Sequence, residues 1–486
     1  MGGNGFIPAC LSGFAASGKD TIAFSIYDGK EISNITYPQF ADDILRTAGF
    51  LKERQIYGQH IGLVSANSYG WIVVFFGVAA SGNVPVLLNP ALPGDMLRKQ
   101  CEQADVSMIW SDGSADEEFF CAMKGIQQLR YDEMMQALPM ELADLHQAEP
   151  EETIVLLATS GTTGKSKIVE FSLQNIQACL ADVTPIAGLS DRMLLVVPLY
   201  HVSGLISVLT RLQLRQVVCI GRGVKYMIGD MPVLNPAFVS MVPALLESLV
   251  KLLRRAKTPE QRQRYIGTSL RGIAVGGAGV NPELCGCMLQ LGIQVQSAYA
   301  MTETTGVGTW CIWEEAALGS IGKPVGRMQC RIENGELLLK GPSVMKGYYR
   351  DPEETAGVIV DGWLHTGDLG YCDENGYYYI TGRKKNVIIL SNGENVNPEE
   401  IEAVFGECEA MEECLVYSDG KGICADVYAK NREAAMAYIK AYNETMPLYR
   451  QVYKVTYTEE PLPKTGSGKI KRKENKQWQT KIPCSG

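Results

Sequence analysis

Short apolar runs alternate with amphipathic stretches over residues 61–110, and this alternation constrains the fold more than any other feature of the chain. Ile61–Ala66, Val84–Leu88 and Val106–Trp110 have the length and the β-branched content of buried strands. Trp71–Ala80 and Gly94–Gln103, which lie between them, are typical of helices. A β-α-β-α-β order predicts a mostly parallel sheet with helices on its faces.

The alternation extends in both directions. Thr21–Ser25 and Glu31–Thr36 read as a strand pair, and a helix is expected over Tyr37–Lys52. Further strands are expected at 153–157, 193–197, 217–220, 238–241 and 272–275. Residues 128–151 are polar and acidic and are expected to form a surface connector. A chain of 486 residues should contain two or three domains.

From Ser320 onward the pattern changes to small antiparallel sheets. Asn334-Gly335 and Asn375-Gly376 lie between β-rich runs, and this dipeptide favours tight hairpins. The charged residues 383–385 then interrupt the pattern, and a helix follows with Asn397 as N-cap and Glu400 completing a capping box. We therefore expect an α/β fold in two parts. Residues 1–382 should form a large domain of mixed β-sheets flanked by helices, with a small β-barrel-like part, and residues 383–486 a small mobile α+β domain.

Composition narrows the class of protein. A formal charge of −9 argues against nucleic acid as a partner. The fourteen cysteines are scattered, as in a reduced cytosolic protein, and Cys285-Gly-Cys287 is not expected to bind a metal. No basic residue precedes Lys19, so no secretory signal is predicted. Trp71–Ala80 is too short for a membrane span. A cytoplasmic protein is expected.

A Gly- and hydroxyl-rich loop, A-T-S-G-T-T-G-K-S-K, occupies Ala158–Lys167 between two expected strands. Gly161 and Gly164 allow backbone angles at which successive N–H groups converge on an anion, and the hydroxyls and lysines add donors. The loop is not a Walker loop, because Thr159 stands where that motif needs glycine and no helix follows directly. It suits a polyphosphate, and the alternative is a mobile surface loop.

Four further stretches carry reactive or ligand-binding side chains. They are Q-S-A-Y-A-M-T-E-T at Gln296–Thr304, G-W-L-H-T-G-D-L-G at Gly362–Gly370, the run Gly382–Glu402 that begins G-R-K-K-N, and P-K-T-G-S-G-K-I-K-R-K at Pro463–Lys473. Together with the loop, in this order, they resemble the core signatures of the adenylate-forming superfamily. That superfamily comprises acyl- and aryl-CoA synthetases, luciferases and the adenylation domains of peptide synthetases. Each motif alone has an ordinary structural explanation, such as a turn, a surface charge or a basic tail.

The resemblance implies a role for each matching residue. Those on the β- and γ-phosphates would be Thr159, Ser160, Gly161, Thr162, Thr163, Gly164 and Lys167. Gly277, Ala278 and Tyr299 would hold the adenine, Thr302 the α-phosphate, Glu303 the Mg²⁺, and Asp368 with Arg383 the ribose. Lys469 would bridge the carboxylate and the α-phosphate as the catalytic lysine. Lys385 would be the domain hinge, and Ser391, Asn392 and Gly393 would line the thiol tunnel.

The acid pocket is less constrained than the ATP site. His201 would gate it beside the α-phosphate, or would be an ordinary structural histidine. The pocket would comprise His201, Gly276, Gly277, Val307 and Gly308. No acidic residue follows His201 to hold an ammonium group, so an α-amino acid is disfavoured. The region resembles acyl- and aryl-acid ligases, including the succinylbenzoate type, and fatty, aryl and dicarboxylic acids all remain open.

The implied activity is ATP-dependent conversion of a small carboxylic acid into an acyl-adenylate, followed by transfer of the acyl group to the thiol of CoA. One alternative is transfer to the phosphopantetheine of an acyl carrier protein. Another is a non-catalytic nucleotide-binding sensor, which the presence of Lys469 and Glu303 disfavours. No G-x-S-x-G occurs, so a serine hydrolase is disfavoured. Ser166, Ile168, Ala300, Asn386 and Asn392 depart from the family's usual residues, but none of them removes a catalytic group.

Overall fold

The computed structural model describes residues 6–113, 123, 125–159, 167–187, 191–277, 281–312, 317, 319–390, 394–464 and 470–472. The chain forms two compact units. The first contains residues 1–330 and 339–364, and the second contains residues 331–338 and 365–486. The expected domain boundary at 382/383, with its hinge at Lys385, stays a prediction, because a static division into compact units does not identify a pivot.

A seven-stranded sheet in the first unit contains the early β-α-β alternation. Its order is β18 (Gly347–Tyr348), β8 (Lys167–Ser172), β7 (Thr153–Thr159), β4 (Val84–Leu88), β3 (His60–Val64), β5 (Val106–Trp110) and β6 (Gln127–Leu129). Strands β7, β4, β3, β5 and β6 are parallel, whereas β8 and β18 are antiparallel to their neighbours. The parallel part confirms the prediction from the alternation.

A nine-stranded sheet contains most of the remaining strands of this unit. Its order is β15 (Lys323–Pro324), β14 (Thr309–Ile312), β13 (Gln294–Tyr299), β12 (Gly272–Gly276), β11 (Phe238–Met241), β9 (Arg192–Leu195), β10 (Val217–Ile220), β1 (Ile22–Tyr27) and β2 (Ile32–Thr36). The six central strands from β13 to β1 are parallel, and antiparallel strands close both edges. Two mixed sheets flanked by helices thus form most of this unit, as expected for a large domain of mixed β-sheets.

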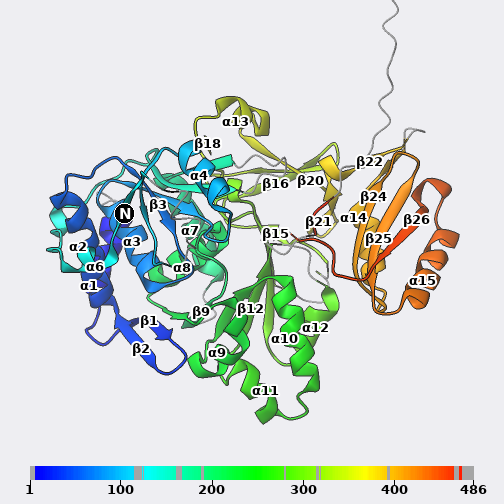
Figure 1. The fold of residues 1–486 in the computed structure, drawn as a ribbon, viewed down its shortest axis with the longest axis horizontal. Helices are drawn as coiled ribbons and strands as arrows, with labels where there is room; N and C mark the ends of the chain where they lie inside the picture. The colour runs from blue at the N-terminus through cyan, green and yellow to red at the C-terminus, as the bar shows by residue number, and fades with distance from the viewer. Residues whose placement is uncertain are drawn as a thin grey trace, which may run out of the picture. The chain divides into compact units, whose positions relative to one another are not determined.

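Helices cover these sheets. Their bounds are α1 Phe6–Ala15, α2 Tyr37–Glu53, α3 Tyr69–Ala80, α4 Gly94–Gln103, α6 Tyr131–Gln136, α7 Leu173–Val183, α8 Val202–Gln213, α9 Met227–Leu234, α10 Pro243–Arg255, α11 Pro259–Ile266, α12 Pro282–Gln290 and α13 Pro352–Val358. Short 3₁₀ turns occupy Leu142–Asp144, Thr184–Ile186, Val224–Tyr226 and Thr302–Thr304 (η4). Helices α1, α2, α3 and α6 pack together. Helix α10 packs on β12, α12 packs on β13, and α11 contacts α9 and α10 (Figure 1).

Three features bear on the expectations from sequence. Every residue of Trp71–Ala80 is buried in α3, which explains why that stretch is apolar throughout. No helix among the described residues is long and apolar enough to cross a membrane. The expected connector over 128–151 was wrong in part, because β6 and α6 form there and bury Leu129 and Met134.

A five-stranded sheet follows, with the order β16 (Gln329–Glu333), β17 (Glu336–Lys340), β20 (Trp363–Cys372) and β19 (Ile359–Val360), and with β21 (Tyr378–Arg383) paired to β20. Asn334 and Gly335 both have positive φ, 50° and 78°, which confirms the tight hairpin predicted between β16 and β17. The second hairpin, between β20 and β21, has a longer loop, in which the Asp373 carboxylate accepts from the N–H groups of Asn375 and Tyr377.

The rest of the second unit has its own core. Strands β24 (Met411–Ser418), β25 (Ile423–Ala429) and β26 (Val452–Thr458) form a sheet that packs with α14 (Pro398–Gly406) and α15 (Arg432–Thr445) (Figure 1). Short elements complete it: 3₁₀ turns at Lys384–Asn386 (η6) and Leu448–Arg450, and the paired strands β22 (Ile388–Ile389) and β23 (Asn395–Val396). Phe405 of α14 packs edge-on against Tyr442 of α15, with 5.1 Å between ring centroids.

One detail at the start of α14 differs from expectation. Asn397 is the N-cap and Pro398 begins the helix, as predicted, but the capping box does not form. The Asn397 side-chain amide donates to Glu400 Oε1 at 3.0 Å instead of its oxygen accepting a backbone N–H. Glu400 in turn pairs with Arg450, at 2.6 Å between Oε2 and Nη2.

Candidate active site

The carboxyl ends of parallel strands in the nine-stranded sheet bring several predicted site residues to one edge. Strands β12 and β13 are parallel neighbours, with Gly276 opposite Ala298. Gly277 and Tyr299 therefore lie side by side where these strands end. Strand β9 is also parallel to these strands and is separated from β12 by β11. His201 follows the carboxyl end of β9. This edge is where ligands bind in open α/β sheets.

Glycines keep the backbone near Tyr299 accessible. Gly277 has φ +86°, and no atom lies within 4 Å of the place where its Cβ would be. At Gly308 a Cβ would lie 2.7 Å from the Tyr299 carbonyl oxygen, so glycine is needed for this close approach. Val307 is buried beside it. The backbone at Gly277 is therefore exposed, with open space where a side chain would be.

The segment after β13 turns sharply and anchors to the β17–β18 connection of the same unit. Thr305 has a left-handed backbone conformation, with φ 55°, and its hydroxyl donates to the Ser343 carbonyl at 2.7 Å. The Met345 N–H donates to the carbonyl of Glu303 at 2.8 Å. Thr302 and Glu303, which form the first part of η4, are only partly buried. These bonds hold the backbone around Glu303, and the residue as a whole stays partly exposed.

Tyr348 of β18 joins two of the predicted site residues. Its hydroxyl donates to Glu303 Oε1 at 2.9 Å, and burial followed by the charge of Glu303 raises the pKa of this phenol. The ammonium of Lys167, at the start of β8, lies 4.7 Å from the centroid of the same ring. Lys167 also forms an ion pair with Glu354 in α13. Tyr348 thus contacts the predicted metal ligand and the predicted phosphate-binding lysine.

The ends of the predicted phosphate loop are defined by strand pairing. Thr159 at the end of β7 pairs with Lys167 at the start of β8, so the loop leaves and re-enters the sheet at adjacent positions. Ser160, Gly161, Thr162, Thr163 and Gly164 lie outside the described residues, as do Ala278, Ser391, Asn392, Gly393 and Lys469. The roles expected for these residues stay predictions.

His201 is the N-cap of α8 and does not cap the helix with its side chain. Its ring lies 4.8 Å from that of Tyr200. Desolvation by the surrounding protein lowers the pKa of the imidazole, although the residue as a whole is exposed. A neutral imidazole at the sheet edge is compatible with the gating role. The helix behind it is packed closely, since a Cβ on Gly204 would lie 2.1 Å from the Pro198 carbonyl oxygen.

The second unit brings Asp368 and Arg383 together on paired strands. Asp368 in β20 faces Arg383 in β21, and the side chains form an ion pair with 2.6 Å between Oδ1 and Nε. Asp368 is buried, while Arg383 is partly exposed. Lys385 lies in η6, where desolvation and the positive charge of Arg383 lower the pKa of its ammonium. The next residue, Asn386, donates to Glu399 of α14 at 2.6 Å.

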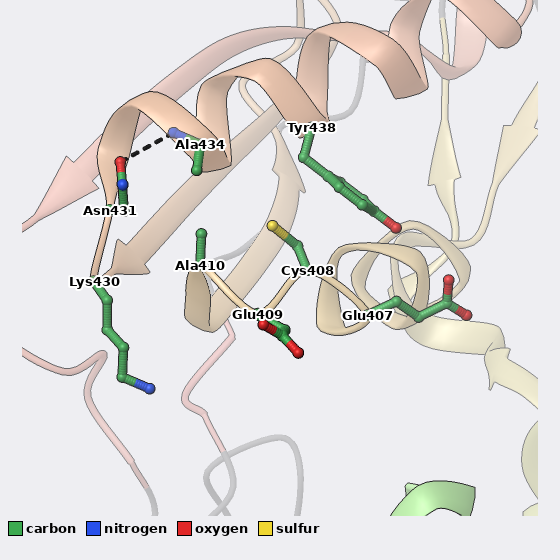
Figure 2. Close-up of a pocket in the computed structure, with 8 residues that line it drawn as sticks. All are labelled: Glu407, Cys408, Glu409, Ala410, Lys430, Asn431, Ala434 and Tyr438. Atoms are coloured by element: carbon green, nitrogen blue, oxygen red, sulfur yellow. Dashed lines mark hydrogen bonds between the residues drawn. The ribbon is translucent and has the colours of Figure 1, made fainter.

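The second unit also carries a hollow of about 520 Å³, which Figure 2 shows between α14 and the start of α15. It is lined by Glu407, Cys408, Glu409, Ala410, Lys430, Asn431, Ala434 and Tyr438. The amide oxygen of Asn431 is occupied in capping α15, because it accepts from the Glu433 and Ala434 N–H groups at 3.1 Å each. None of the predicted site residues that the structure describes lines this hollow.

Sequence reasoning missed three residues of these networks: Tyr348, Glu354 and Glu336. Glu336 is buried in β17 and pairs with Lys384 at 2.9 Å, and it accepts from the Gly367 N–H next to Asp368. One signal was available in G-Y-Y-R-D-P-E-E-T over 347–355, which places a short strand directly before a capped helix. That pattern indicates a compact anchored segment but not what it contacts.

Comparison with known proteins identifies the class. Residues 13–349 match the model of the AMP-binding enzyme family, so the chain belongs to that family. It is 31% identical over 428 residues to a 2-succinylbenzoate–CoA ligase of Oceanobacillus iheyensis, covering 84% of this chain and 85% of the relative. It is 28% identical over 542 residues to a long-chain-fatty-acid–CoA ligase of Bacillus subtilis, covering 97% and 94% respectively.

The fold agrees. An o-succinylbenzoate CoA synthetase from Bacillus subtilis, solved with the acyl-adenylate intermediate OSB-AMP, is similar with a TM-score of 0.84 at 25% identity, covering 96% of this chain and 98% of that one. The same enzyme has been solved with ATP and magnesium, with a TM-score of 0.82 at 26% identity and coverage of 95% and 98%. The chain is an AMP-forming acid–thiol ligase, which uses ATP to activate a carboxylic acid as an acyl-adenylate and then transfers the acyl group to CoA.

Proposed function

We propose that the adenylation site lies at the carboxyl edge of the nine-stranded sheet, and that the matched residues have the roles their motifs imply. Tyr299 and Gly277 would hold the adenine, Thr302 the α-phosphate and Glu303 the Mg²⁺. The observation that supports this best is the adjacency of the β12 and β13 ends, which places an open glycine surface beside an aromatic ring and a partly exposed carboxylate.

The surroundings of Glu303 fit a magnesium ion that is shared with a nucleotide. Among the described residues no group of three or more His, Cys, Asp or Glu side chains could hold a metal ion. Mg²⁺ commonly binds through one or two carboxylates, with waters and substrate phosphates completing its octahedron. The ion would offset charge on the polyphosphate. In this arrangement Glu303 supplies the carboxylate, and its Oε1 is already oriented by Tyr348.

The remaining residues divide between the two half-reactions. Thr159, Lys167 and the intervening loop would hold the β- and γ-phosphates, with Asp368 and Arg383 on the ribose. Lys469 would bridge the carboxylate and the α-phosphate during adenylation. A rotation about Lys385 would then withdraw Lys469 and bring Ser391, Asn392 and Gly393 to the thiol tunnel. One lysine would thereby serve only the first half-reaction.

For the acid we propose an aryl carboxylic acid of the succinylbenzoate type, with a fatty acid as the second candidate. Relatives at 28–31% identity are named 2-succinylbenzoate–CoA ligases. The proposed pocket comprises His201, Gly276, Gly277, Val307 and Gly308. Its small residues leave room for a ring, and no acidic residue follows His201 to hold an ammonium group, which disfavours an α-amino acid. Each acid class should compete for this one pocket.

The acyl acceptor has one alternative. A carrier-protein phosphopantetheine could replace free CoA, because both end in the same thiol.

We place the enzyme in the cytoplasm, where ATP and CoA are available. No disulfide joins the cysteines in the described part of the chain, which is usual for reducing compartments.

Pyrophosphate release tests the proposal. The enzyme is mixed with Mg-ATP and a panel of aryl, dicarboxylic, fatty and amino acids, each with and without CoA. Sustained release with an aryl acid only when CoA is present supports an aryl acid–CoA ligase. Sustained release with fatty acids alone reassigns the acid. A single burst that CoA does not change indicates a carrier-protein acceptor, and the absence of release with every acid contradicts the proposed site.

A further inference from the structure

Tyr348 occupies a position that its aromatic ring alone does not explain. It lies in β18, opposite Val169 of β8, and only 6% of its surface is exposed. A phenylalanine would fill the same volume. The hydroxyl, however, donates to Glu303 at 2.9 Å, and Glu303 lies in η4, which follows β13 of the nine-stranded sheet. The phenol therefore connects the strand next to the phosphate loop with the turn after β13.

The backbone around Tyr348 is held on two sides. Its N–H donates to the Thr355 hydroxyl of α13 at 2.9 Å, and the Tyr349 N–H donates to the Ile168 carbonyl of β8 at 2.8 Å. The Met345 N–H donates to the Glu303 carbonyl. Since both the phenol and the carboxylate are attached to anchored backbone, the bond between them fixes the direction of the Glu303 side chain.

The electrostatic surroundings favour donation by Tyr348. The Tyr348 oxygen lies 2.9 Å from Glu303 Oε1, and since an ionised carboxylate only accepts hydrogen bonds, the phenol O–H is the donor. The Lys167 ammonium lies over the ring, where the negative face of the π-system attracts it. Among the hydrogen bonds between described residues, Glu303 Oε2 accepts none, which leaves that oxygen available for another ligand.

We propose that Tyr348 is a positioning residue for the metal: its hydroxyl orients the Glu303 carboxylate so that Oε2 faces the nucleotide-bound cation, and its ring holds Lys167 beside the phosphates. This inference rests on the proposed role of Glu303. Residues that hydrogen-bond a metal ligand tune metal affinity by roughly 10- to 100-fold when they are removed. Loss of the hydroxyl should therefore weaken the binding of the metal ion, while the binding of the metal-free nucleotide should change little.

Binding of an uncleavable ATP analogue tests this without turnover. The dissociation constant of α,β-methylene-ATP is measured by calorimetry with and without Mn²⁺ for the wild type and for Y348F. The ratio of the two constants is the gain in affinity that the metal supplies. We expect Y348F to reduce this gain by roughly tenfold or more while changing metal-free binding little. E303Q should abolish the gain, and adding Y348F to E303Q should change nothing further.

Y69F is the matched control, because the Tyr69 hydroxyl donates to the Asp43 carboxylate at 2.6 Å in the same unit and Tyr69 packs on Phe24 of β1. It removes the same kind of bond away from the site and should leave the metal gain unchanged. Tyr348→4-aminophenylalanine keeps the ring and a donor and should restore most of the gain. This variant also tests the positioning role if Y348F does not fold.

The outcomes separate two failures. If the wild type shows no metal-dependent gain, the proposed role of Glu303 fails, and the inference on Tyr348 fails with it. If the wild type shows the gain and E303Q abolishes it, but Y348F retains it, only the positioning role of Tyr348 is overturned. That role is also overturned if Y69F reduces the gain as much as Y348F, or if 4-aminophenylalanine does not restore it.

Discussion

The carboxylate of Asp368 pairs with the guanidinium of Arg383 across neighbouring strands, with 2.6 Å between Oδ1 and Nε. The Asp368 N–H donates to the Thr366 hydroxyl at 3.0 Å, which fixes the turn that carries the carboxylate. A fixed acceptor beside a forked donor suits two adjacent hydroxyls. The pair would thus be arranged in advance for the ribose that we propose it binds, and the register of β20 and β21 explains how residues 15 positions apart meet.

D368N should raise the KM for ATP by about tenfold, because a hydrogen bond to a charged group contributes about 1.5 kcal/mol and the amide is neutral. The KM for the acid should change little. Steady-state pyrophosphate release at varied ATP measures this. E336Q is the control, since it neutralises another buried carboxylate of the same sheet that pairs with Lys384. Equal effects of both variants on the KM for ATP would contradict the ribose assignment.

The stability of the second unit should depend on Glu336 in a defined pH range. Although burial opposes its ionisation, Lys384, the Gly367 N–H and His365 hold the pKa of Glu336 below its ordinary value of 4.5. As the pH falls below 4.5, the unfolded chain binds a proton at this site before the folded chain does, so stability falls. E336Q should cost about 1–2 kcal/mol at pH 7, and this deficit should shrink as the pH falls through the lowered pKa. Denaturant unfolding at pH 7 and pH 4 measures it, and a deficit equal at both pH values would exclude the mechanism.

Much of the fold is predictable because its elements are encoded locally. Strand β4 and helix α4 have the predicted bounds, since each is a contiguous apolar or amphipathic run with clear ends. Strand β6 and helix α6 were missed because they are three and six residues long, and only Leu129 and Met134 among them are buried. Such short polar elements depend on their neighbours rather than on their own pattern.

The candidate site was likewise predictable in part. Tyr299 and Gly277 could be placed together, because parallel neighbouring strands end at one edge. The contacts of Tyr348 with Glu303 and of Glu354 with Lys167 span 45 and 187 positions. They depend on the antiparallel addition of β18 to β8, which no local signal specifies. Asn397 shows that sequence predicts the position of a residue better than its hydrogen bonds. Its N-cap position was predictable, but the partner of its side-chain amide was not.

E354Q should strengthen ATP binding modestly. Glu354 neutralises Lys167 in the structure, and the phosphates would have to displace it. Because the Glu354 side chain is 42% exposed, the pair contributes at most about 1 kcal/mol, so the KM for ATP should fall by about two- to threefold. E353Q is the matched control, because it removes the adjacent charge in the first turn of α13. A KM that rises in E354Q would mean that Glu354 positions Lys167 for ATP instead of competing for it.

K469A should separate the two half-reactions. Lys469 is predicted to bridge the carboxylate and the α-phosphate in the transition state of adenylation only, and loss of such a donor typically slows a reaction by about 10²–10³-fold. Thioester formation from a supplied acyl-adenylate and CoA should stay within about twofold of the wild type, because the lysine would have left the site. Single-turnover assays of each half-reaction measure both rates. K471A is the control, since Lys471 is exposed and its backbone N–H, which donates to the Pro463 carbonyl at 2.7 Å, is kept. If K469A slows both half-reactions equally, the lysine does not act as a group that serves only the first conformation, and the proposed rotation about Lys385 loses its chemical reason.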